Sequence, residues 1–256
     1  MAINTYQATA SSFTFTAWAT ASAVDHPPSN LALQTAPYRT WRSRSLASGQ
    51  ERIVIQLALP LGIATVYLTN ANFAAVSIYT SIDGGWTWVS QAASQAVTRD
   101  PRTGRRQAWI AFSAVSNVTH VRLDCATPDA GATYFELGSV SVSTSAVPFS
   151  DNPQWPVRCI VHRAATRLDY LTGGGEVHED GRAYVELTMG SGVFDRRTTI
   201  VTELFKVIDF TRATPFVLYE NRGNTAQAYF LRRVDDAEIT ERVGVASTSL
   251  TFVECI

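Results

Sequence analysis

The chain of 256 residues is poor in several residue types, and each shortage excludes a class of protein. It has three cysteines, which lie far apart and form no Cys-x-x-Cys pair. Neither a disulfide framework nor a zinc site is therefore predicted, and three buried free thiols are expected instead. No run approaches the ~20 apolar residues of a membrane helix. The first residues, MAINTYQATASS, contain neither a basic nor a long apolar segment, so no secretion signal is expected.

Charged residues are also scarce, and their near-equal numbers of each sign exclude partners that bind through a strong electrostatic field. Charged residues make up 17% of the chain and the net charge is −1, so neither nucleic acid nor an anionic membrane is a predicted partner. Lys206 is the only lysine among the 21 basic residues. Arginine's planar fork suits protein interfaces, but a GC-rich genome would give the same bias, and both interpretations stay open.

What the chain does have is a strand pattern, clearest at residues 65–88, TVYLTNANFAAVSIYTSIDGGWTW. Apolar residues stand at alternate positions around Val66 and Val76, as in half-buried strands. Asn70-Ala71-Asn72 and Asp83-Gly84-Gly85 interrupt the pattern with residues that favour turns. Trp86 and Trp88 then resume the alternation, and packing in the core is the preferred interpretation of both.

The whole chain is predicted to be mainly β, in two domains. Residues 1–147 contain about eight short strands with turn signals every 8–12 residues, which predicts a β-sandwich of the jelly-roll type. A proline-rich stretch, VPFSDNPQWP, marks a linker. Residues 148–256 predict a smaller, mainly β domain with one short helix over Thr198–Phe210.

The landmarks of the first domain resemble, in their order, the discoidin or galactose-binding-like family. They are the Asp25 loop, TWRS at 40–43, ERIVIQL at 51–57, the Ser-Ile-Asp-Gly-Gly turn and Val121-Arg122-Leu123. The resemblance implies binding of glycans, lipids or proteins by loops at one end of the sandwich. Members often carry a structural calcium, for which Asp25 and Thr40 stand at suitable positions. No acidic ligand is identified in the last strand, and Glu136 is the nearest acidic residue. A hard cation needs several oxygen ligands, so no cofactor is predicted, with a structural calcium left as an open alternative.

The second half resembles tail-tip proteins of long-tailed bacteriophages. The resemblance is carried by a Gly-rich hairpin with Gly174, Gly181 and Tyr184, and by Thr214-Pro215-Phe216-Val217. It implies a distal-tail-like protein of the tail tip or baseplate, located in the virion tail and assembled in the host cytoplasm. The implied partners are other copies in a ring, further tail proteins such as the tube and hub, and host-surface glycans.

Five residues are candidates for ligand binding, each with a structural alternative. Asp25 and His26 would form a ligand or sugar-binding pair, or a simple exposed turn. Trp41 and Arg42 would stack a sugar or face a partner, although Trp41 plugging the end of the sandwich is the slightly preferred interpretation. Asp83 is a candidate because of its loop, but a turn role is sufficient to explain it.

Four arginines crowd one predicted hairpin: Arg99, Arg102, Arg105 and Arg106. They would dock on an acidic surface of a neighbouring subunit, or they would simply be solvated.

No catalytic motif is found, because His-Glu-x-x-His, Gly-x-Ser-x-Gly and phosphate-binding glycine loops are absent. The protein is predicted not to be an enzyme. The preferred hypothesis is a structural component of a phage tail tip, and the alternative is a stand-alone carbohydrate-binding module.

Overall fold

The computed structural model describes most of the first half of the chain and the strands of the second. The described residues are 7–10, 15–32, 39–46, 49–144, 147–148, 157–162, 165–171, 174–180, 184–190, 194–195, 216–219, 225, 227–234, 238–242 and 245–254. The described structure is mainly β, with antiparallel sheets, which confirms the predicted fold class. Its one described helix is the short 3₁₀ helix η1 (Pro28–Ala32). The helix predicted over Thr198–Phe210 lies outside the described residues.

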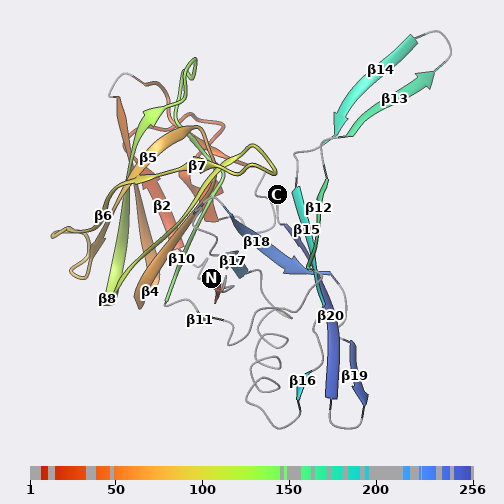
Figure 1. The fold of residues 1–256 in the computed structure, drawn as a ribbon. Helices are drawn as coiled ribbons and strands as arrows, with labels where there is room; N and C mark the ends of the chain where they lie inside the picture. The colour runs from red at the N-terminus through yellow and green to blue at the C-terminus, as the bar shows by residue number, and fades with distance from the viewer. Residues whose placement is uncertain are drawn as a thin grey trace.

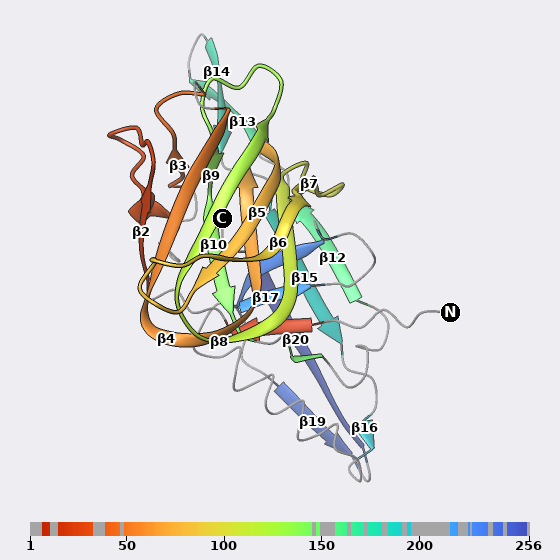
Figure 2. The ribbon, with the colours of Figure 1, turned by 90° about the vertical axis from the view of Figure 1, so that its left-hand side faces the viewer.

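The first half forms a seven-stranded sheet that folds over to make both layers of a sandwich (Figures 1 and 2). Its path runs β10-β4-β8-β5-β6, with β2 beside β4 and β7 beside β8. A separate pair, β3 (Trp41–Arg42) and β9 (Glu136–Leu137), lies nearby. The strands of the sheet are β2 (Phe15–Ala19), β4 (Gln50–Ala71), β5 (Phe73–Ser81), β6 (Val89–Ala96), β7 (Thr98–Arg99), β8 (Arg106–Pro128) and β10 (Ser139–Ser143).

Two long strands, β4 and β8, hold the layers together. Their register shifts between Gln56 and Thr65, where residues 58–60 are exposed, and both strands bend there (Figure 2). On one side of the bend they pair with β2 and β5, and on the other side β4 pairs with β10. Alternate residues on both sides point inward and form one buried apolar core.

The second half contributes most of a nine-stranded sheet. Its path runs β11-β1-β17-β18-β20-β15-β12, and β16 and β19 also pair with β20. The N-terminal strand β1 belongs here, because it pairs with β17 and β11. The domain boundary at 147/148 stays a prediction. The strands are β1 (Gln7–Ala10), β11 (Val147–Pro148), β12 (Val157–His162), β15 (Tyr184–Gly190), β16 (Phe194–Asp195), β17 (Phe216–Tyr219), β18 (Ala228–Arg233), β19 (Glu238–Arg242) and β20 (Val245–Glu254).

The two sheets share one core. Val217, Ala228 and Phe230 belong to the same buried cluster as the sandwich residues, and the rings of Trp109 and Tyr219 stack with centroids 5.4 Å apart. Strands β13 (Ala165–Leu171) and β14 (Gly174–Asp180) instead form a hairpin of their own (Figure 1). No helix among the described residues is long and apolar enough to cross a membrane.

Candidate functional site: an aromatic pocket on the outer face of the sandwich

The site lies on the outer face of the layer formed by β2, β4, β8 and β5. Because side chains alternate along a strand, Ile53 and Leu123 point into the core while their neighbours point outward. The strand register then places Trp18 opposite Val54, and Val54 opposite Arg122. Residues from distant parts of the chain therefore form one row across the outside of the sheet.

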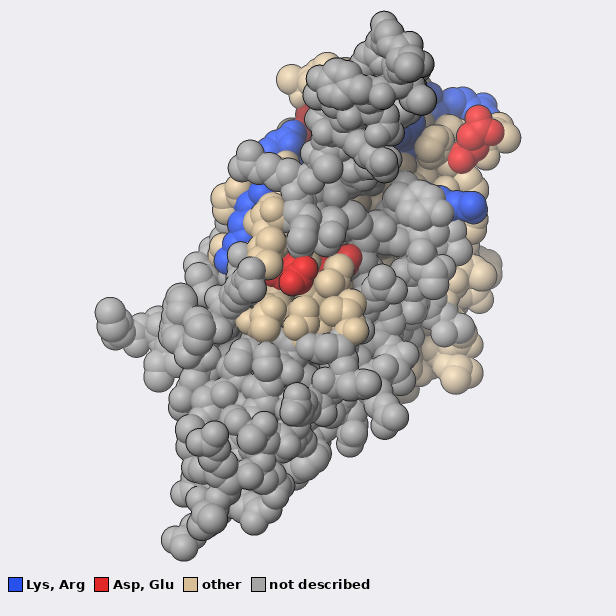
Figure 3. Space-filling view, turned by 90° about the vertical axis from the view of Figure 1, so that its right-hand side faces the viewer, with Lys and Arg blue, Asp and Glu red and all other residues tan. Residues whose placement is uncertain are grey.

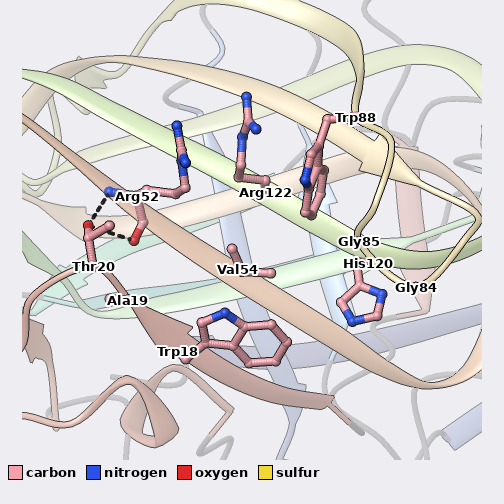
Figure 4. Close-up of a pocket in the computed structure, with 10 residues that line it drawn as sticks. All are labelled: Trp18, Ala19, Thr20, Arg52, Val54, Gly84, Gly85, Trp88, His120 and Arg122. Carbon is pink, nitrogen blue, oxygen red and sulfur yellow. Dashed lines mark hydrogen bonds between the residues drawn. The ribbon is translucent and has the colours of Figure 1, made fainter.

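This row is part of a pocket of about 330 Å³, named here the aromatic pocket. Val54, which is buried, lies between its two sides (Figure 4). Trp18 and His120 lie on one side in that view, and Arg52, Arg122 and Trp88 lie on the other. Trp18 is 45% exposed. The pocket thus offers indole surface beside several hydrogen-bonding groups, the composition typical of small-molecule sites.

His120 holds the two indoles in position. Its ring meets that of Trp18 edge-on with centroids 5.8 Å apart, and that of Trp88 at 6.5 Å. Its Nδ1 is 3.1 Å from the hydroxyl oxygen of Thr119. Burial lowers the pKa of His120, an effect that the nearby Asp83 carboxylate partly offsets. The neutral imidazole is therefore favoured at neutral pH.

The two arginines of the pocket are oriented by the same carboxylate. The Nε atoms of Arg52 and Arg122 each lie 3.2 Å from Oδ1 of Asp124. The Arg122 guanidinium also lies over the ring of Tyr79, 3.9 Å from its centroid, and 5.1 Å from that of Trp88. Arg52 is the freer of the two, with 51% of its side chain exposed.

A preorganised loop closes one end of the pocket. Asp83 accepts hydrogen bonds from the Ser81 hydroxyl at 2.6 Å and from the Thr87 backbone N–H at 2.9 Å, and these bonds hold the pKa of its carboxyl well below the usual range. Gly84 and Gly85 follow in the left-handed region, with φ of 79° and 91°. A Cβ on Gly85 would lie 3.6 Å from Trp88 and 3.8 Å from His120, at ordinary contact distances, so an added methyl group would take up space at this end of the pocket.

A second depression of about 550 Å³ adjoins the aromatic pocket and is named here the polar hollow. Thr20 and Arg52 line both. The Thr20 hydroxyl donates to Glu51 at 2.6 Å and accepts from the Arg52 backbone N–H at 3.1 Å. Ser45, Gln50 and Asp124 also line the polar hollow.

The structure brings four of the five predicted ligand-binding residues together, but away from the aromatic pocket. The Arg42 backbone N–H donates to the His26 carbonyl at 3.2 Å, and His26 Nδ1 is 3.1 Å from the Thr40 carbonyl. Asp25 is exposed in the same loop. Trp41 is fully buried and donates from its indole N–H to the Ser22 hydroxyl, so it packs in the core and offers no face to a ligand. Arg42 pairs with Glu136 at 3.4 Å.

Asp83, the fifth candidate, has the turn role and also shapes the pocket, although it is not among the pocket-lining residues. The preferred core interpretation of Trp86 is wrong, because its side chain is 89% exposed. Trp88, predicted to pack in the core too, is half-buried and lines the pocket. The apolar alternation ends at the loop, and these tryptophans follow the loop rather than the strand.

The four arginines of the hairpin are engaged within the chain. Arg99 and Arg106 bind Asp129 at 2.7 and 2.8 Å. Arg102 donates to the Tyr229 hydroxyl at 3.1 Å, and Arg105 pairs with Glu254. Arg102 and Arg105 thus contact the protein's own second sheet, whereas 57% of the Arg99 side chain is exposed. Docking on a neighbouring subunit stays a prediction.

No group of three potential metal-ligating His, Cys, Asp or Glu residues occurs within the part of the chain that the structure describes. Thr40 is buried, and its carbonyl contacts the side chains of His26 and Asn30. The carboxylate of Glu136 forms an ion pair with Arg42. Of the two calcium positions that the resemblance suggested, the Thr40 carbonyl is thus used for contacts within the protein, whereas Asp25 is exposed.

The sequence interpretation missed Trp18, Arg52, His120 and Arg122 as site residues. Trp18 and Arg122 each stand between two apolar residues, and Arg52 and His120 each precede one, in FTAWA, RIVIQL and HVRLDC. Alternation therefore marks these four residues as facing outward. What the sequence lacks is the register that aligns three distant strands.

Comparisons with known proteins extend to about half of the chain. No protein family model matches it, and no curated protein matches it. Among solved structures it is similar to chitosan-binding module 1 of a chitosanase/glucanase from Paenibacillus sp. IK-5 (19% identity, 50% of this chain and 94% of that chain, TM-score 0.41). It is also similar to CBM32-3 from a family 31 glycoside hydrolase of Clostridium perfringens (15%, 54% and 95%, TM-score 0.43). A third is an F5/8 type C domain from Bacteroides fragilis (15%, 54% and 97%, TM-score 0.44).

Proposed function

We propose that this chain is a non-catalytic carbohydrate-binding protein whose site is the aromatic pocket. One observation carries the proposal: Trp18 and Trp88 present indole surface around a pocket that also contains two arginines and a histidine. A sugar ring has an apolar face of C–H groups and a rim of hydroxyls, so it needs aromatic surface and hydrogen-bond donors or acceptors side by side.

The side chains that would supply the aromatic surface and the hydrogen bonds are held in place by contacts within the protein. His120 fixes both indoles, Asp124 orients both arginines, and the hydrogen bonds of Asp83 fix the loop at the end. Preorganisation of this kind lowers the entropy cost of binding. The same contacts argue against catalysis, because Asp124, which lines the adjoining polar hollow, is already paired with two arginines and acid–base chemistry needs a carboxyl that is free to exchange a proton.

The test is a glycan array followed by calorimetric titration of the best ligand. Trp88→Ala and Trp18→Ala should each weaken binding at least tenfold, which is about 1.4 kcal/mol. Trp86→Ala is the matched control, because Trp86 lies in the same loop but does not line the pocket. Equal loss in all three variants, or an empty array, would contradict the proposal.

Assembly in a phage tail tip is a second proposed function, and it does not exclude the first. The observation in its favour is the hairpin β13–β14, whose two strands pair only with each other among the described strands. An isolated two-stranded hairpin is marginally stable in water, so a neighbouring subunit that covers it would stabilise it. A ring of copies joined to tube and hub proteins would provide such a neighbour.

Light scattering on the purified protein tests the assembly proposal. A species several times the mass of one chain is expected, and deletion of residues 165–180 should reduce it to single chains. A monomer at every concentration, with the chain absent from purified virions, would contradict assembly and leave carbohydrate binding intact.

A further inference from the structure

The aromatic pocket and the polar hollow lie side by side. Thr20 and Arg52 line both, so the two depressions meet at these residues. Each has a volume within the range of about 300–1,000 Å³ that single small-molecule sites occupy. Together they exceed what one sugar ring would fill.

We infer, building on the proposed carbohydrate binding, that the site takes an internal segment of a linear, neutral glycan chain spanning both parts. One sugar unit would lie against Trp18 and Trp88, and the next would lie over Arg52 toward Gln50 and Ser45. A site for a chain end would have no second depression beyond the first sugar, whereas here the polar hollow adjoins the aromatic pocket at Thr20 and Arg52.

Arg52 stands where the two parts meet. Its backbone N–H binds Thr20 and its Nε binds Asp124, which fixes the stem of the side chain. Half of the side chain remains exposed. The fixed guanidinium is thus placed to donate hydrogen bonds to hydroxyls of two successive sugars.

The charges of the depression are balanced, which indicates a neutral chain. Arg52 and Arg122 are matched by Asp124 and Glu51 along the same surface. A polyuronate would meet the Asp124 carboxylate beside the two arginines, with the buried Glu51 close behind, and a cationic polymer would meet the arginines beside that carboxylate. Figure 3 shows the opposite side of the molecule, where the described basic side chains also lie in separate groups.

The experiment measures affinity against chain length with named probes. These are glucose and galactose, the β-1,4-linked oligomers of each from two to six units, and oligogalacturonate as the charged counterpart. Affinity for one neutral series should rise at least tenfold from one unit to three and then level off. Gln50→Ala combined with Ser45→Ala should remove that rise with chain length, whereas Trp88→Ala should weaken the binding of all lengths, the single sugars included.

The possible failures are distinguishable. Equal affinity for one unit and six units would overturn the internal-segment inference while leaving carbohydrate binding standing. Tighter binding of oligogalacturonate, lost at high salt, would overturn the neutral-chain part. Binding of no glycan by probe series or array would refute the proposed function, and this inference with it.

Discussion

Two regions of the molecule combine aromatic rings with arginines and carboxylates, and they use them differently. One is the aromatic pocket on the outer face of the sandwich. The other, named here the junction network, lies between the two sheets and comprises Tyr67, Asp100, Arg105, Tyr229 and Glu254. The two regions contain the same residue types. They must therefore be distinguished by how deeply the side chains are buried and by which groups they bind.

In the junction network the polar groups bind one another away from water. Glu254 is 4% exposed, pairs with Arg105 and accepts a hydrogen bond from the Val185 backbone N–H at 3.0 Å. The Tyr67 hydroxyl donates to the Ala228 carbonyl at 3.0 Å. Burial raises the pKa of both Tyr67 and Glu254. In the pocket, by contrast, Trp18 and Arg52 are about half exposed, so their surfaces remain available to a ligand.

The largest expected effect comes from breaking the buried ion pair. Arg105→Leu leaves the Glu254 carboxylate buried without its partner, and we expect a loss of about 3–5 kcal/mol in the free energy of unfolding. Arg99→Leu is the control, because 57% of that side chain is exposed and surface pairs contribute only about 0–1 kcal/mol. Urea unfolding measures both. Equal losses would show that burial does not distinguish these arginines.

The next prediction compares two glycine substitutions, and it distinguishes a change in the shape of the pocket from a cost in backbone strain. Gly85 and Gly104 both have positive φ, of 91° and 72°, but only a Cβ on Gly85 would meet other atoms, those of Trp88 and His120. Alanine at either position should cost about 1–2 kcal/mol of stability. Only Gly85→Ala should weaken glycan binding, because it narrows the pocket. Titration of both variants with the same glycan checks this, and unchanged binding by Gly85→Ala would place the ligand elsewhere.

A loss of stability of similar size is expected for a single hydroxyl of the junction network. Tyr67→Phe leaves the buried Ala228 carbonyl without that donor and should cost about 1–3 kcal/mol. Tyr79→Phe on the outer face, where the ring rather than the hydroxyl contacts Arg122, should change stability by less than about 0.5 kcal/mol. Thermal and urea unfolding compare the two. A larger loss at Tyr79 would reverse the contrast between the two regions.

The smallest effect is a pH dependence from His120. Its pKa is lowered in the folded state by burial, so between the unfolded value of about 6.5 and the folded value the unfolded chain binds the extra proton. Stability should therefore fall as the pH drops below about 6.5. His120→Gln should reduce this slope, measured by unfolding at pH 7.5 and at pH 5.5. An identical slope in the variant would mean that His120 does not titrate differently on folding.

Local patterns in the sequence predict the strands well, because alternation is a property of neighbouring residues. In residues 51–57 and 120–125 the alternation by itself shows which side chains face inward. The turn at Asp83 also follows from its own residues. Each of these predictions depends only on residues that lie close together in the sequence.

The register between strands that are distant in the chain cannot be predicted from one sequence. This register determines which residues become neighbours in both the aromatic pocket and the junction network. Trp18, Val54 and Arg122 become neighbours only through strand pairing. Arg105 finds Glu254 at a separation of 149 residues, so in the sequence alone the arginine cluster resembles a surface for another subunit. Trp41, a candidate for stacking a sugar, is buried, while Trp86, expected inside, is exposed. An isolated tryptophan carries no periodicity that would tell these cases apart.

The most direct test of the central claim is calorimetric titration of the folded protein with the best array glycan, beside Trp88→Ala and Trp86→Ala. The account predicts saturable binding that weakens at least tenfold in Trp88→Ala and stays within twofold in Trp86→Ala. Binding that survives Trp88→Ala unchanged, in a protein that remains folded, would contradict it.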